Sequence, residues 1–172
     1  MTNKELLAKL NELRRLPAET EVFEFKEAKN TYDFNRLGEY FSALSNEANL
    51  KGRPHAWLIF GIKDKGRTIV GSLFRPDRKD LDSLKGEIAR KTTNRITFIE
   101  IHELHLLEGR VLMLEIPAAP KGLPIAFEGH YYGRDGEELS PLNLEEIERI
   151  RSQAVSEDWS AAPVPDATVD DL

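Results

Sequence analysis

Cationic side chains recur in three places along the chain, and together they have the chemistry to bind the phosphates of a nucleic acid. One group lies on and after a predicted helix: Lys85, Arg90, Lys91 and Arg95. Lys51 and Arg53 stand just before a predicted strand, and Arg134 lies near a further strand. Phosphate contacts from Lys and Arg supply most of the sequence-independent affinity of nucleic-acid-binding proteins. The same pattern is also typical of the solvated face of a helix, so both interpretations stay open here.

Two tyrosines stand next to the last of these cations. Tyr131 and Tyr132 have rings that can stack on bases, and Arg134 can hold a phosphate backbone. The alternative is a strand whose aromatic residues are buried and whose arginine forms an ion pair. We favour this second interpretation from the sequence.

Other catalytic or metal-binding patterns are absent from the sequence. The chain has no cysteine, which excludes disulfides, thiolate metal sites and a cysteine nucleophile. It contains neither a G-x-S-x-G nor a Walker A motif. The four histidines are scattered, and His102 and His105, three apart on a predicted strand, face opposite ways. We therefore interpret the histidines as structural.

Composition predicts a water-soluble, globular protein with one domain. The chain has 172 residues, of which 40% are hydrophobic and 31% charged. No apolar run approaches the roughly 20 residues that span a bilayer. The polar and then amphipathic N-terminus is not typical of a signal peptide. We expect a cytoplasmic protein without a membrane partner.

Net charge argues against a nucleic-acid binder, but its distribution does not. The net charge is -6, whereas such proteins are usually basic. Residues 157–172 carry five acids and no base. Without them the chain is close to neutral, which is compatible with a local basic patch.

Hydrophobic periodicity predicts an α+β fold, a mixed sheet of about six strands with helices packed on it. Thr2 with Glu5 forms a capping box, and Asp33 and Asn143 are further helix caps. The predicted helices cover residues 2–15, 34–44, 80–92 and 144–153. The predicted strands cover residues 21–26, 56–62, 68–71, 96–107, 110–116, 124–127 and 130–132, with 56–62 and 68–71 forming a hairpin.

Two segments differ in organisation. Residues 1–155 form the predicted domain. Residues 156–172 are rich in Pro, Ala and Asp, and we interpret them as an acidic linker or the start of a missing C-terminal module.

Four segments, in this order, resemble motifs of the Schlafen AlbA-like domain, also described as a divergent AlbA or divergent AAA domain. They are ETEVFEFK at 19–26, ALSN at 43–46 followed by LIFGIKDKG at 58–66 and IVG at 69–71, RVLMLEIP at 110–117, and GHYYGR at 129–134. The resemblance covers about residues 15–152. It implies the Schlafen AlbA-like fold and an RNA- or DNA-binding function. Bacterial members of this family are usually the N-terminal parts of longer transcriptional regulators, RNA-binding proteins or ATP-binding proteins.

The resemblance also implies an alternative, a divalent-metal-dependent endoribonuclease. Glu19, Glu24 and Asp64 match the order of the acids that some family members use, and they would hold Mg2+ or Mn2+. The simpler interpretation makes Glu24 a solvated residue or a partner of Lys26, and Asp64 a turn residue. Both interpretations stay open from the sequence.

A further alternative from the family is an ATP-binding or partner-binding regulatory module. Besides RNA or DNA, we count a second copy of the chain, in a homodimer, among the candidate partners. Many members carry a Gly-Gly pair shortly after the Asn of the second motif. Here residues 47–55 contain a single glycine, Gly52. A loop poor in glycine offers fewer backbone N–H groups to a phosphate, which weakens the ATP-binding interpretation.

Overall fold

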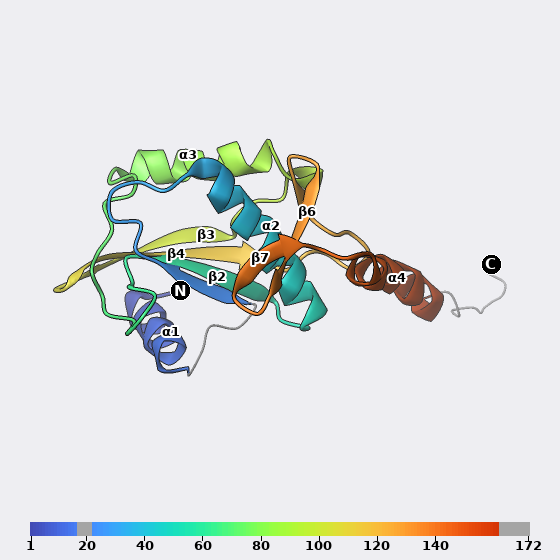
Figure 1. Ribbon diagram of the computed structural model, residues 1–172, viewed down its shortest axis with the longest axis horizontal. Coiled ribbons are helices and arrows are strands. Elements are labelled where there is room, and N and C mark those ends of the chain that lie inside the picture. The colour runs from blue at the N-terminus through green and yellow to red at the C-terminus, as the bar shows by residue number, and fades with distance from the viewer. Residues whose placement is uncertain (17–21, 162–172) are drawn as a thin grey trace.

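The computed structural model describes residues 1–16 and 22–161, and it confirms the predicted α+β class (Figure 1). The helices are α1 (Asn3–Arg15), α2 (Phe34–Leu50), α3 (Arg78–Ala89) and α4 (Leu144–Ala161), with a short 3-10 turn at Thr93–Arg95. The strands are β1 (Phe23–Lys26), β2 (His55–Phe60), β3 (Glu100–Leu106), β4 (Gly109–Pro117), β5 (Ala126–Phe127), β6 (His130–Asp135) and β7 (Glu138–Pro141).

The larger sheet has four strands in the order β1-β2-β4-β3, with β1 parallel to β2 and the other pairs antiparallel. Side chains alternate between the two faces of a sheet, so each strand contributes residues to a hydrophobic core on either face. Trp57 and Ile59 pack with the leucines of α1, whereas Leu58 and Phe60 pack with α2 and α3. The sheet is therefore a layer between α1 on one side and α2 with α3 on the other (Figure 1).

The smaller sheet, β5-β6-β7, is antiparallel and packs on α2. Asn46, the last residue of the ALSN segment, fastens it there. Its side-chain amide donates to the carbonyls of Ile125 and Tyr132 at 2.9 Å each, and its oxygen accepts from the Ile125 N–H at 2.8 Å. Because Asn46 is fully buried, these bonds replace water that it cannot reach.

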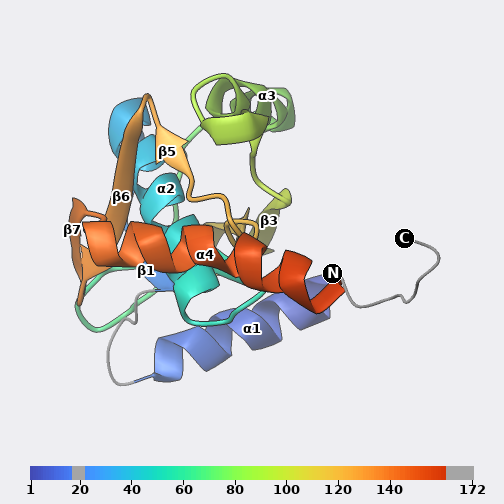
Figure 2. The ribbon, with the colours of Figure 1, turned by 90° about the vertical axis from the view of Figure 1, so that its right-hand side faces the viewer.

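Helix α4 lies across the C-terminal end of α2 (Figure 2). The amides of Asn49 and Gln153 hold the two helices together by bonding each other in both directions, at 2.9 and 2.7 Å. Helix α4 continues through Ala161, past the boundary predicted at residue 155. Residues 162–172 of the predicted acidic segment lie outside the described residues.

Two details of the predicted sheet are wrong. The strands form two sheets rather than one, and β7 had no counterpart in the prediction. The predicted hairpin of residues 56–62 and 68–71 is reduced to one antiparallel bridge between Ile62 and Ile69. Strand β2 pairs with β1 and β4 instead, and such long-range pairing leaves no local signal.

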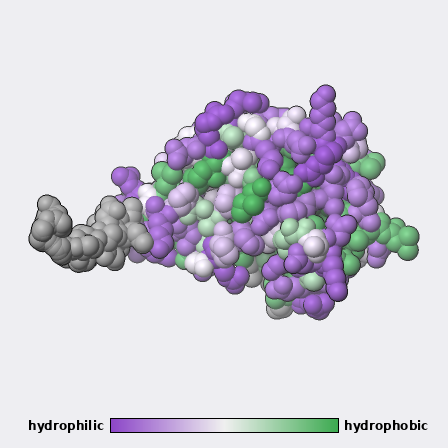
Figure 3. Space-filling view, turned by 180° about the vertical axis from the view of Figure 1, so that it is seen from behind, coloured by the Kyte–Doolittle hydropathy of each residue, from purple (hydrophilic) through white to green (hydrophobic). Residues whose placement is uncertain are grey.

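Figure 3 shows the side opposite to that of Figure 1, where the surface is mostly hydrophilic with scattered hydrophobic patches. The β3–β4 hairpin projects from the body in Figure 1, and Leu107 between its strands is fully exposed. In the described part of the chain, no helix is long and apolar enough to cross a membrane.

Candidate nucleic-acid interface

Three of the predicted phosphate-binding cations meet where α3 ends. Arg90 caps the helix, Lys91 follows it, and Arg95 closes the 3-10 turn, and all three are exposed. Lys91 Nζ lies 2.9 Å from an oxygen of Glu128. Arg90 and Arg95 make no ion pair with any residue that the structure describes. Their positive charges are therefore presented to solvent.

The β5–β6 turn lies against this segment, and the strand that follows the turn carries aromatic residues. The Glu128 N–H donates to the Lys91 carbonyl at 2.8 Å, and Thr92 forms a β-bridge with Phe127. His130 pairs with Phe127 in the next strand, and Tyr131 follows it. We call Arg90, Lys91, Arg95, His130 and Tyr131 the α3-end surface. Tyr131 is 39% exposed, so part of its ring is open to a ligand.

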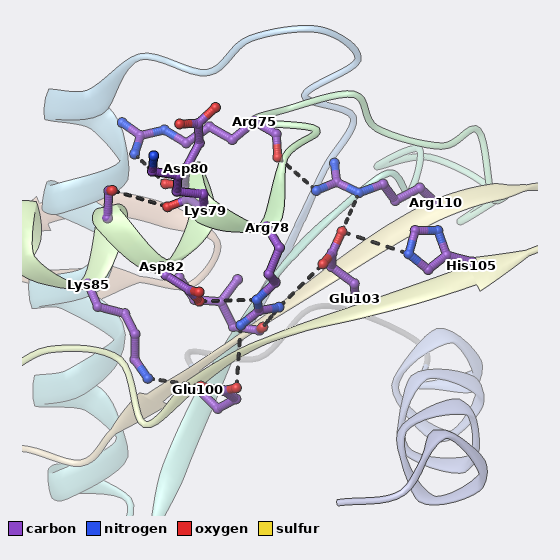
Figure 4. A network of polar contacts seen from close by, with 12 residues as sticks. Arg75, Arg78, Lys79, Asp80, Asp82, Lys85, Glu100, Glu103, His105 and Arg110 are labelled. Carbon is purple, nitrogen blue, oxygen red and sulfur yellow. Dashed lines mark hydrogen bonds and ion pairs between the residues drawn. The ribbon is translucent and has the colours of Figure 1, made fainter.

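Lys85 belongs to a partly exposed charge network between α3 and β3 rather than to this surface (Figure 4). Its Nζ lies 2.8 Å from Glu100 Oε1, which joins α3 to β3. Arg78 reaches the same carboxylate at 3.4 Å and also contacts Asp82 at 3.1 Å. The hydrogen bond from Lys85 outweighs partial burial and lowers the pKa of Glu100. Lys85 is therefore held against β3, away from Arg90 and Arg95, and its contact with phosphate stays a prediction.

A second part of the network fixes α3 from the other side. The guanidinium of Arg75 donates two hydrogen bonds to Glu87, at 2.8 and 2.9 Å. These bonds outweigh partial burial and lower the pKa of the Glu87 carboxyl. Arg110 Nε donates to Glu103 at 2.9 Å (Figure 4). Its Nη atoms donate to the carbonyls of Phe74 and Arg75, in the loop before α3. These contacts set the orientation of α3 and therefore the place where Arg90 emerges.

Arg134 is buried, which corrects the expectation that it contacts phosphate. It is 5% exposed, and its guanidinium pairs with the Glu24 carboxylate and donates to the Phe23 carbonyl at 2.9 Å. The interpretation favoured from the sequence, an arginine in an ion pair, is the arrangement found, but Tyr131 is exposed rather than buried. Tyr132 is half-buried, and this burial raises the pKa of its hydroxyl.

Lys51 and Arg53 lie at the other end of α2 from the α3-end surface. Phe127, beside that surface, packs against Gly38 near the start of α2. Lys51 follows Gly38 by thirteen residues, about 20 Å along a helix axis. Both cations are exposed, but the structure does not bring them to the α3-end surface.

The three predicted metal ligands are not gathered among the described residues. Glu19 lies outside these residues, and Asp64 is exposed in a turn. Glu24 is 3% exposed, with one oxygen on Arg134 and the other 3.1 Å from Lys26 Nζ. No group of three His, Asp or Glu side chains that could hold a metal occurs in the described part. The Mg2+ or Mn2+ site and the nuclease activity stay predictions.

Lys26, the second partner of Glu24, stays protonated although it is partly buried. Burial lowers the pKa of Lys26, but hydrogen bonds to Tyr40 and Glu24 outweigh it, so the pKa ends above its usual value. Burial raises the pKa of the neighbouring Tyr32 to about 12. Glu24 and Lys26, from the ETEVFEFK segment, therefore belong to a buried charge network under α2.

Comparison with known proteins identifies the family of this chain. The model of the Schlafen AlbA_2 family matches residues 19–143, most of the chain. The chain belongs to the Schlafen AlbA_2 family. Its fold resembles that of the DIP2311 protein from Corynebacterium diphtheriae, at 20% identity and a TM-score of 0.60, over 87% of this chain.

This Schlafen AlbA_2 chain spans only 29% of the length of the Corynebacterium protein. A second similar structure is the N-terminal domain of a RecG-related protein from Nitrosomonas europaea, at 22% identity and a TM-score of 0.46, covering 80% of this chain and 91% of that one. No curated protein matches the chain.

The Schlafen AlbA_2 domain also carries a cation group that sequence reasoning missed. Arg14, Arg15 and Arg67 line a hollow of about 250 Å³ at the C-terminal end of α1. Arg14 and Arg15 occupy the last turn of the helix, where cations are common because they complement the helix dipole. An adjacent arginine pair before Pro17 was the available signal, but nothing local connects it with Arg67.

Proposed function

We propose that this Schlafen AlbA_2 domain binds nucleic acid through the α3-end surface, with Arg90, Lys91 and Arg95 on phosphates and Tyr131 against a base. The supporting observation is that the β5–β6 hairpin, which carries the exposed ring of Tyr131, packs against the segment of residues 90–95, which carries the cations. The cations come from the end of α3, and the ring of Tyr131 comes from a hairpin 36 to 41 residues further along the chain.

Charge balance at this surface favours an anionic ligand. The carboxylate of Glu128 lies at this surface, and it pairs with Lys91. Arg90 and Arg95 make no ion pair with a described residue, although the charge of Arg90 helps to lower the pKa of Glu87, and guanidinium binds phosphate with two parallel hydrogen bonds. Phosphates on this surface would release counterions, which makes binding favourable and dependent on salt.

The exposed ring favours a single-stranded segment over a duplex. A base can stack on Tyr131 only where it is not already stacked in a helix, as in loops, bulges and single strands. Stacking depends little on the identity of the base, so we expect weak sequence preference. RNA and DNA both offer the required phosphate and base.

The family context supports a role in a larger protein. We propose that the domain is the nucleic-acid-binding part of a transcriptional regulator, since bacterial members of the Schlafen AlbA_2 family, to which the chain belongs, are usually parts of such longer proteins. In this role the fold would supply binding, and chemistry or regulation would come from elsewhere.

Fluorescence anisotropy with labelled single-stranded RNA and DNA tests the proposal. The variant R90Q/K91Q/R95Q should bind both at least tenfold more weakly than the wild type at low salt. The matched control K4Q/R149Q/R151Q removes the same charge from exposed positions elsewhere and should bind as the wild type does. Equal losses in both variants would mean that only net charge matters, and no loss in either would reject the surface.

A further inference from the structure

The end of α1 and the turn of residues 63–67 enclose a second cationic site. The hollow of about 250 Å³ between them is lined by Asn11, Arg14, Arg15, Gly66 and Arg67. Helix α1 covers the face of the four-stranded sheet that lies opposite α3 (Figure 1). This site, the α1-end pocket, is therefore separate from the α3-end surface.

Two of the arginines are held in place by neutral groups. Arg14 Nε donates to the Arg67 carbonyl at 2.9 Å, and its Nη1 donates to Asn11 Oδ1 at 3.3 Å. Arg67 Nη1 donates to the Leu13 carbonyl at 3.0 Å, at the end of α1. Its guanidinium also lies 5.1 Å from the ring centre of Phe25. These contacts fix both side chains without cancelling their charges.

No described carboxylate lies within ion-pair distance of these arginines. The nearest acid in sequence on α1, Glu12, pairs instead with Lys9 at 3.3 Å. Arg15 is exposed and makes no hydrogen bond with another described side chain. Three like charges at one hollow repel one another, so an anion bound between them would lower the electrostatic energy. The arrangement is already set before a ligand arrives, which reduces the entropic cost of binding.

We propose that the α1-end pocket binds a phosphate monoester, the terminal phosphate of a nucleic-acid strand. A monoester carries a charge of about -1.5 to -2 at neutral pH and offers three strong acceptor oxygens. A phosphodiester in the backbone offers two such oxygens and one charge. Three guanidinium groups match the monoester better, because each can bond a different oxygen.

The size of the pocket agrees with a small group. Pockets for drug-sized ligands usually measure about 300–1,000 Å³, and this hollow is smaller. It has room for a phosphate and part of a sugar, whereas the lining offers no aromatic ring for a base. The assignment rests on the proposed nucleic-acid function and adds selectivity for strand ends to it.

The test compares one labelled single-stranded oligonucleotide in three forms, with a 5′-phosphate, a 3′-phosphate or hydroxyl groups at both ends. At least one phosphorylated form should bind the wild type about tenfold more tightly than the hydroxyl form, a difference of about 1.4 kcal/mol. The variant R14Q/R15Q should lose this difference and still bind the hydroxyl form. Arg151→Gln, an exposed helix arginine elsewhere, should keep it. Competition by inorganic phosphate shows whether the free anion suffices.

The outcomes separate this inference from the proposed function. Equal affinity for all three oligonucleotides, all bound through the α3-end surface, would overturn the α1-end pocket alone. Binding of no oligonucleotide would overturn both proposals. A phosphate-dependent gain that survives in R14Q/R15Q would place the terminal phosphate elsewhere and reject the pocket. Thermal unfolding of each variant checks that the substitutions act on binding and not on the fold.

Discussion

The carboxylate of Glu24 and the guanidinium of Arg134 form an ion pair in the interior, although 110 residues separate them in the sequence. The pair ties the first strand of the large sheet to the middle strand of the small one. Glu47, on α2 between the sheets, accepts the Arg134 N–H at 3.1 Å. The GHYYGR segment therefore holds the two sheets together through its arginine.

Breaking this pair should destabilise the protein strongly. Glu24→Gln leaves the Arg134 charge buried without its carboxylate, which typically costs about 3–5 kcal/mol. Urea unfolding measures the loss. Glu138→Gln, on an exposed position of β7, should change the free energy of unfolding by less than about 0.5 kcal/mol. A stable Glu24→Gln protein would show that this carboxylate is not needed as a structural partner.

Two helix glycines should respond in opposite ways to alanine. A Cβ at Gly38 would lie 2.1 Å from the ring of Phe127, which is buried and has little room to move. Gly38→Ala should therefore cost about 1–3 kcal/mol by overpacking, despite the better helix propensity of alanine. At Gly86 in α3 the nearest atom would be Arg90 Nη1 at 3.6 Å, an ordinary contact.

Gly86→Ala should accordingly stabilise the protein by up to about 1 kcal/mol. Thermal unfolding of the two variants side by side checks both signs. Stabilisation by Gly38→Ala would mean that the small sheet does not sit against α2 as described.

Acid should weaken the attachment of α3. The pKa of Glu87 is lowered in the folded protein by its hydrogen bonds from Arg75, so the folded state binds protons less readily than the unfolded state. This contribution is present above the unfolded pKa near 4.5 and is lost as the pH falls through the lower folded value.

The difference in melting temperature between wild type and Glu87→Gln should therefore be large at pH 7 and shrink toward pH 3. Melting curves across this range supply the comparison. A difference that is constant with pH would rule out the ion pair as its cause.

Local sequence patterns predicted the helices better than the sites. Side-chain caps at Thr2, Asp33 and Asn143 are present as expected, because each depends on residues within one turn. An ion pair of Arg134 was favoured from the sequence, but its partner Glu24 could not be named because 110 residues separate the two. The ion pair of Lys85 was also missed, since its partner Glu100 lies on β3 and Lys85 on α3. Tertiary pairing of charges, which sequence spacing does not encode, decided which cations are available to a ligand.

Stacking on Tyr131 should add to the affinity of the α3-end surface without changing its salt dependence. Tyr131→Ala should weaken binding of single strands by about 1–3 kcal/mol, the usual range for a base on an aromatic ring. Its salt dependence should equal that of the wild type, because the ring carries no charge. Tyr131→Phe keeps the ring and should keep the affinity. Anisotropy titrations at several salt concentrations give both quantities, and a changed slope in Tyr131→Ala would contradict a stacking role.

The salt dependence of single-strand binding tests the central claim most directly, since its slope counts phosphate contacts rather than overall affinity. Each contact to a single strand contributes about 0.7 to the slope of log Kobs against log salt. Removing Arg90, Lys91 and Arg95 together should therefore flatten the slope by about 2, while K4Q/R149Q/R151Q keeps the wild-type slope. Parallel lines for the wild type and R90Q/K91Q/R95Q would contradict nucleic-acid binding at the α3-end surface.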